Sequence, residues 1–301
     1  MEYLFILLAV VCIAGQFSFT KLYQGAVGQN LLTTLVMLTG TSTVGTLVFF
    51  FASGCKLEYT TVSLLLSIAS GLITVPYYLI GIKVLSLGSL AIYSMFMMLG
   101  GMLVPFFYGI TFLHETISIG KVIGTVLLTV FIVLQAIWQK SPDEKEGKGK
   151  DGRLFFTLCL IIFFINGLTG VVTKAHSVSK GAVDARSFTT TGCIVTALVS
   201  VTLLSVLCLK NKTVSVPVLK KAFKGRSLLY IFLLGAISYT GSFLLIMSAS
   251  KVPASVQYPI VSGGAIVISA LVSAFIFREG LSKKEWISVA GAFASTFLYM
   301  F

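Results

Sequence analysis

Uncharged polar and aromatic side chains within long apolar runs are the residues of this chain whose types could do chemistry. Gln257, Tyr258 and Pro259 are consecutive near the start of one such run. Proline has no N–H, so Pro259 frees the carbonyl of Ser255, and irregular backbone at membrane depth is tolerated where it lines a wet cavity or is buried in protein. These residues predict recognition of a solute by hydrogen bonds, without catalysis. The predicted solute-binding residues are Gln16, Tyr77, Tyr93, Met97, Asn166, Tyr239, Gln257, Tyr258 and Ser262.

The same side chains have a second interpretation as hydrogen bonds between helices, which are worth ~0.6 kcal/mol on average in a membrane. Helical spacing puts Tyr93, Met97 and Gly100 on one face of their segment. Gln257 and Gly264 take the corresponding places in a later segment. Both interpretations stay open at this stage.

Acidic side chains lie at segment ends and in loops, and none is near the middle of an apolar run. A charge at the bilayer centre costs ~2.5–3.5 kcal/mol on an insertion scale, so one that is present usually marks an ion or proton site. The distribution therefore favours a neutral or zwitterionic solute, and it predicts neither an intramembrane protease nor a metal site.

Glu115 and Glu279 are the most prominent acids, because each ends an apolar segment and is followed three residues later by a serine, Ser118 or Ser282. One interpretation makes them gating residues that pair with a nearby cation. The other, which we favour, makes them caps that accept N–H groups at the start of the next helix.

The composition predicts an all-α integral membrane protein. Of 301 residues, 56% are hydrophobic and only 11% are charged, whereas soluble domains have about 25% charged residues. The net charge of +12 is expected to meet anionic lipid headgroups rather than nucleic acid. Because a spanning helix needs ~20 apolar residues, ten spans fit. The predicted spans are 3–20, 31–52, 61–85, 89–113, 118–138, 154–173, 187–209, 228–250, 254–277 and 283–301.

The two halves of the chain repeat one another. One constant shift superposes the pairs Gly71 and Gly235, Gly100 and Gly264, and Glu115 and Glu279, and the pair Thr20-Lys21 matches Thr173-Lys174 at a different shift. The predicted units are 1–139 and 154–301, joined by a polar linker at 140–153. Each unit holds an odd number of spans, so the second lies inverted relative to the first, as in many transporters. Predicted adjustable points are Pro76, Gly100, Pro259 and Gly264.

Ten apolar segments, the repeat and the Glu-x-x-Ser element resemble the EamA family of the drug/metabolite transporter superfamily. The resemblance implies two inverted five-helix repeats around a central cavity, with transport by alternating access and no cofactor. It implies a multi-pass protein of a bacterial plasma membrane, monomeric or homodimeric, whose partners are a small-molecule solute and the lipid bilayer. A flippase subunit for lipid-linked sugars and a membrane scaffold or sensor are the alternatives.

The orientation of the termini receives two opposing predictions. Most Lys and Arg residues follow the odd-numbered spans, which by the positive-inside rule places both termini outside. The family resemblance implies that both termini are inside.

Overall fold

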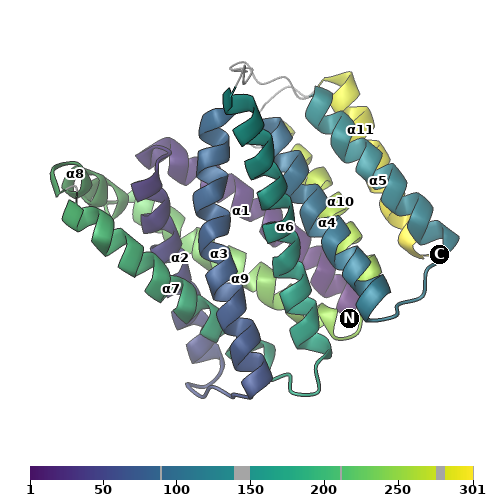
Figure 1. Ribbon diagram of the computed structural model, residues 1–301, viewed down its shortest axis with the longest axis horizontal. Helices are drawn as coiled ribbons and strands as arrows, with labels where there is room; N and C mark the ends of the chain where they lie inside the picture. Colours follow the sequence, from purple (N-terminus) through teal and green to yellow (C-terminus); the bar gives the residue numbers. More distant parts are fainter. Residues whose placement is uncertain (89, 139–149, 211, 276–281, 301) are drawn as a thin grey trace.

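The fold is all-α in the computed structural model, which describes residues 1–88, 90–138, 150–210, 212–275 and 282–300. Within these ranges there are eleven α-helices and one short 3-10 helix (Figure 1). They are α1 (Glu2–Val27), α2 (Leu31–Ala52), α3 (Thr61–Leu87), α4 (Leu90–Phe112), α5 (Ile119–Trp138), α6 (Lys150–Val178), α7 (Ala185–Lys210), α8 (Lys212–Ala222), α9 (Arg226–Ala249), α10 (Ala254–Phe275), α11 (Lys283–Phe297) and η1 (Leu298–Met300).

Nine of these helices are long and apolar enough to cross a membrane within the described ranges, namely α1 to α7, α9 and α10. The chain is therefore a multi-pass membrane protein. Its outward side chains agree with this, because large apolar residues such as Leu7, Phe51, Val126 and Phe293 are exposed on the helix surfaces. The helix α11 has 15 residues and is followed by η1, and Ser282 caps it through the capping box with Glu285 that its sequence predicts.

The structure corrects two boundaries and one loop. The helix α1 continues to Val27 rather than ending at Thr20, because the polar end of the helix is packed: Tyr23 is buried and donates its hydroxyl to the carbonyl of Thr33 at 3.0 Å. The helix α6 likewise continues to Val178. The basic stretch after α7, expected to be a loop, contains the helix α8, which packs against α2 and α7.

Eight helices form a closed ring. Each packs against the next in the order α1, α9, α2, α7, α3, α6, α4, α10 and back to α1. The remaining long helices α5 and α11 pair with one another beside α4 and α10, at the edge of the molecule (Figure 1). The interior of the ring is therefore surrounded by side chains from eight different helices.

The loops on the side where α1 begins, here called the N-terminal face, are tied together by hydrogen bonds. Arg186 donates to the carbonyl of Ala52 at 2.9 Å, and Thr60 donates to that of Gly181. These contacts join the loop after α2 to the loop after α6. Lys251, in the turn between α9 and α10, lies 2.7 Å from the carboxylate of Glu2.

Candidate functional site

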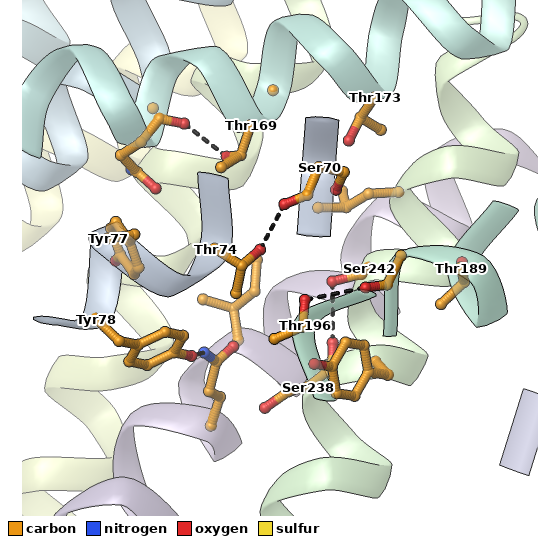
Figure 2. A pocket seen from close by; sticks show the side chains of 18 of the residues that line it. Ser70, Thr74, Tyr77, Tyr78, Thr169, Thr173, Thr189, Thr196, Ser238 and Ser242 are labelled. Carbon is orange, nitrogen blue, oxygen red and sulfur yellow. Dashed lines mark hydrogen bonds between the residues drawn. The ribbon is translucent and has the colours of Figure 1, made fainter. Parts of the chain in front are cut away.

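A cavity of about 340 Å³, here called the first chamber, lies inside the ring and is lined by all eight of its helices. Its walls are rich in hydroxyl groups, which come mainly from α3, α6, α7 and α9 (Figure 2). The serines and threonines labelled there are Ser70, Thr74, Thr169, Thr173, Thr189, Thr196, Ser238 and Ser242.

Helical spacing places these hydroxyls in the chamber in pairs. Residues four apart lie on one helix face, and α3 supplies Ser70 and Thr74 while α9 supplies Ser238 and Ser242 in that way. The hydroxyl of Thr74 donates to the carbonyl of Ser70 at 2.8 Å, and that of Ser242 donates to the carbonyl of Ser238 at 3.1 Å. Such bonds let a polar side chain sit in an apolar helix with its proton satisfied.

A second cavity of about 460 Å³, here called the second chamber, is lined by α1, α2, α3, α4, α5, α10 and α11. It reaches toward the face opposite the N-terminal face, because its lining includes Lys21 near the end of α1 and Glu285 at the start of α11. Methionines form much of its interior. These are Met37, Met95, Met97 and Met98.

The two chambers adjoin at a set of shared lining residues, here called the middle layer. Within it, the side-chain amide of Gln16 donates to the hydroxyl of Tyr78 at 3.2 Å, and the hydroxyl of Tyr77 contacts the sulfur of Met97 at 2.8 Å. Pro76 directly precedes the two tyrosines inside α3. The residues common to both linings are Gln16, Phe17, Met37, Tyr77, Tyr78, Met97 and Met98.

Glu115 forms a buried clamp at the N-terminal face. Its two carboxylate oxygens accept the backbone N–H groups of Ala254 and Ser255, at 2.7 and 2.8 Å, where α10 begins. Lys174 of α6 lies 3.8 Å from the same carboxylate and donates to the carbonyls of Ala249 and Val252. One ion pair therefore holds both ends of the turn between α9 and α10.

The clamp refines what the sequence predicted for Glu115. The carboxylate does accept helix N–H groups, but the helix is α10, far along the chain, rather than α5, which follows it directly. Its cationic partner is Lys174. Sequence reasoning matched Thr173-Lys174 with Thr20-Lys21 but assigned the lysine no role. Glu279 lies outside the described residues.

Most of the predicted solute-binding residues lie in the chambers. Tyr93 lines only the second chamber. Gln257 lines neither: it is fully buried, and its amide donates to the carbonyl of Leu245 at 2.9 Å and to the hydroxyl of Ser248 at 3.0 Å. The residues that line the first chamber are Gln16, Tyr77, Met97, Asn166, Tyr239, Tyr258 and Ser262.

Two of the predicted adjustable points, Gly100 and Gly264, lie at close contacts between helices. Gly100 lies so close to the backbone of Phe163 that a side chain there would overlap it, whereas a side chain at Gly264 would lie 3.0 Å from Val10. Pro76 and Pro259 are inside α3 and α10.

The hydroxyl-bearing walls were missed by sequence reasoning. The signal was available: serine or threonine recurs at four-residue spacing in several apolar segments, as Ser70 and Thr74 illustrate. Single hydroxyls in apolar helices are common, so the signal is informative only once the helices are known to face one cavity.

Metal-binding groups of three or more His, Cys, Asp or Glu residues do not occur among the described residues. The five cysteines are free thiols, and Cys193 is buried beside the first chamber. The polar groups that line the first chamber are therefore hydroxyls, amides, thioethers and the thiol of Cys193, and they can bind a solute by hydrogen bonding and packing.

Comparisons with known proteins support the fold alone. The sequence matches no protein-family model and none of the curated proteins. Among solved structures, one described as a crystal structure of a protein superposes with a TM-score of 0.73 and 16% sequence identity, covering 99% of this chain and 95% of that chain. The ring of helices is thus an arrangement already seen in a solved protein.

Proposed function

We propose that this chain is a secondary transporter resembling the EamA family, which carries a small neutral or zwitterionic metabolite across a bacterial plasma membrane. It works by alternating access between two inverted five-helix halves, residues 1–139 and 154–301. The observation that carries the proposal is the pair of chambers that share the middle layer: the second reaches toward the face opposite the N-terminal face, and the lining of the first includes Thr173 and Thr189, near the end of α6 and the start of α7 at the N-terminal face. A carrier needs such a path, open at either face in turn.

The packing of the ring supports two equivalent halves. Exchanging α1 with α6, α2 with α7, α3 with α9 and α4 with α10 returns the same set of neighbours: α1 packs on α9 as α6 packs on α3, and α4 packs on α6 as α10 packs on α1. When α5 is also exchanged with α11, the contacts between α2 and α7, between α4 and α10, and between α5 and α11 are each mapped onto themselves. A two-fold axis in the membrane plane produces this pattern.

The sequence-matched glycines add a residue-level argument. A side chain at Gly71 of α3 would lie 2.7 Å from the carbonyl oxygen of Gly192 and from Val195 of α7. A side chain at Gly235 of α9 would lie 2.9 Å from the carbonyl oxygen of Thr41 and from Val44 of α2. Each glycine thus packs against a backbone carbonyl group of the partner helix and against a valine three residues after that carbonyl.

Opening and closing can be tested without knowing the solute. Thr173 lines the first chamber and Thr20 lines the second, so a single cysteine at each reports water access to one chamber through its reaction with a water-soluble maleimide. The clamp is released by Glu115→Gln, which removes the carboxylate charge. We expect this change to raise the labelling of Thr173→Cys severalfold and to lower that of Thr20→Cys. The native thiols to be replaced first are Cys12, Cys55, Cys159, Cys193 and Cys208.

The matched control is Glu58→Gln, an exposed acid in the loop after α2 at the same face, which should leave both labelling rates unchanged. Opposite changes at the two cysteines are the signature of alternating access, because one protein population is redistributed between two states. A parallel rise at both cysteines, or no change at either, would argue for a static scaffold or sensor.

A further inference from the structure

The first chamber offers no counter-charge to a bound ion. Among the described residues that line it there is no Asp, Glu, Lys, Arg or His. The charged groups of the clamp, Glu115 and Lys174, are turned toward one another and toward the backbone groups of the turn between α9 and α10. An ion that leaves water without a partner loses several kcal/mol of hydration. The chamber therefore selects against anions, cations and zwitterions.

Half of the serine and threonine hydroxyls labelled in Figure 2 present only lone pairs to the chamber, whereas that of Thr189 has no hydrogen-bond partner. A hydroxyl has one proton and two lone pairs, and many of these protons are already donated within the protein. Thr169 donates to the carbonyl of Asn166 at 2.6 Å, Thr196 donates to that of Gly192 at 3.0 Å, and Tyr258 donates to that of Gly170 at 2.6 Å. Thr74 and Ser242 are committed in the same way. A solute that bonds to these oxygens must bring its own N–H or O–H donors.

The polar and apolar parts of the lining lie on different arcs of the ring. Consecutive helices α7, α3 and α6 supply most of the hydroxyls, while α4, α10 and α1, also consecutive, supply mainly apolar side chains. Further hydroxyls come from α9, which lies between α1 and α2 and supplies Ser238 and Ser242. Gln16, Tyr258 and Ser262 are the polar members of the second arc. The apolar members are Ile13, Phe17, Met97, Met98, Val261 and Ala265.

We propose that the first chamber binds an uncharged, amphipathic solute that carries hydrogen-bond donors on an apolar body, of the class of primary amides and alcohols. The donors of the solute bond to hydroxyl oxygens on α7, α3 and α6, here called the hydroxyl arc. The apolar body of the solute packs against the side chains of α4, α10 and α1. A volume of about 340 Å³ lies within the range of small-molecule sites. This assignment rests on the proposed transport function and narrows its solute.

Four probes built on one skeleton separate charge from donor number. They are phenylacetamide, which is neutral with two N–H donors; N,N-dimethylphenylacetamide, which is neutral with none; phenylacetate, an anion; and 2-phenylethylammonium, a cation. Binding to the purified full-length protein is measured by calorimetry and by the shift of the unfolding temperature. We expect phenylacetamide to bind and each of the other three to bind at least about tenfold more weakly, since an unpaired polar group or charge costs more than one factor of ten.

Paired variants assign the effect to the hydroxyl arc. Thr74→Val and Thr169→Val remove acceptors from the chamber and should weaken phenylacetamide binding severalfold while leaving N,N-dimethylphenylacetamide unchanged. The control is Thr202→Val: Thr202 also donates to a carbonyl of its own helix, that of Leu198, but it faces outward. Its replacement should leave the affinity for phenylacetamide as it is.

The inference is overturned if phenylacetate, 2-phenylethylammonium or the donor-free N,N-dimethylphenylacetamide binds as tightly as phenylacetamide. It is also overturned if none of the four probes binds. The maleimide labelling of the two chambers does not use these probes. Alternating labelling together with failed probe binding would therefore leave the transport proposal intact and reject only this solute class.

Discussion

Two pairs of glycines that correspond in the sequence repeat differ in how alike their contacts are: one pair is packed in the same way, and the other is not. At α3 with α7, and at α9 with α2, the glycines Gly71 and Gly235 meet a carbonyl and a valine at nearly equal distances. At α4 with α6, Gly100 is packed directly on the backbone of Phe163, but at α10 with α1, Gly264 meets only the side chain of Val10. The two glycines Gly100 and Gly264, which correspond in the sequence repeat, are thus packed differently.

Under the proposed transport function, this difference identifies the contacts that would change between the two states. In a carrier of inverted repeats the two halves adopt different conformations at any moment, and exchanging those conformations opens the other face. The tight contact of α4 and the looser contact of α10 are the two conformations expected of one repeated element. Glu115 joins the segment after α4 to the start of α10 at the N-terminal face, so the clamp connects the two helices that carry Gly100 and Gly264.

The largest expected effect comes from breaking the clamp at its buried lysine. Lys174 is 3% exposed, and Lys174→Met leaves the carboxylate of Glu115 and two backbone carbonyls without their cation. Removal of one partner of a buried ion pair costs about 3–5 kcal/mol. We expect a loss of this size in the free energy of unfolding, measured by denaturant titration in detergent.

Lys251→Met is the matched control for that variant. Lys251 lies in the same turn between α9 and α10, but its ion pair with Glu2 is exposed, and exposed pairs add little stability. A similar loss for both lysines would mean that the turn is sensitive to any change of charge, and the clamp would have no special role.

A smaller effect is expected from adding one methyl group to each of the two repeat-related glycines. In Gly100→Ala the new methyl overlaps the backbone of Phe163, which cannot move without shifting α6, and overpacking of this kind costs roughly 1–3 kcal/mol. In Gly264→Ala the new methyl lies 3.0 Å from a side chain of Val10, which can rotate. We expect a clear fall in the unfolding temperature for the first variant and a much smaller one for the second. Equal falls would remove the asymmetry on which the comparison depends.

The sequence predicted the helices well because a spanning helix is specified locally. The bounds of α2 agree with the prediction at both ends, Leu31 and Ala52, since the apolar run and its cap Asn30 are both visible in the chain. The prediction failed where a polar stretch is stabilised by contacts made elsewhere. Tyr23 extends α1 by bonding to Thr33, and α8 forms against α2 and α7.

The site was only partly predictable because partners depend on how the ring closes. Polarity inside an apolar run identified Tyr77 and Asn166 as candidates, and both line the first chamber. Nothing in the spacing shows that Glu115 reaches α10 and Lys174, since the three segments are far apart in the chain. The sequence also does not show which way a side chain points when its helix has neighbours on several sides. Gln257, which was predicted to bind solute, is the clearest example.

The smallest expected effect is that of replacing Gln257, the residue that corresponds to Tyr93 in the sequence repeat. Tyr93 lines the second chamber, whereas Gln257 packs against α9 and leaves its amide oxygen without a partner. The prediction that Gln257 binds solute implies that Gln257→Leu would weaken solute binding more than it lowers the folded yield. From its position we expect the reverse: a stability change of only ~0.6 kcal/mol, and unaltered affinity for phenylacetamide measured by calorimetry. Reduced affinity at unchanged yield would show that α10 rotates Gln257 into the passage in another state, and the two counterparts would then exchange roles during transport.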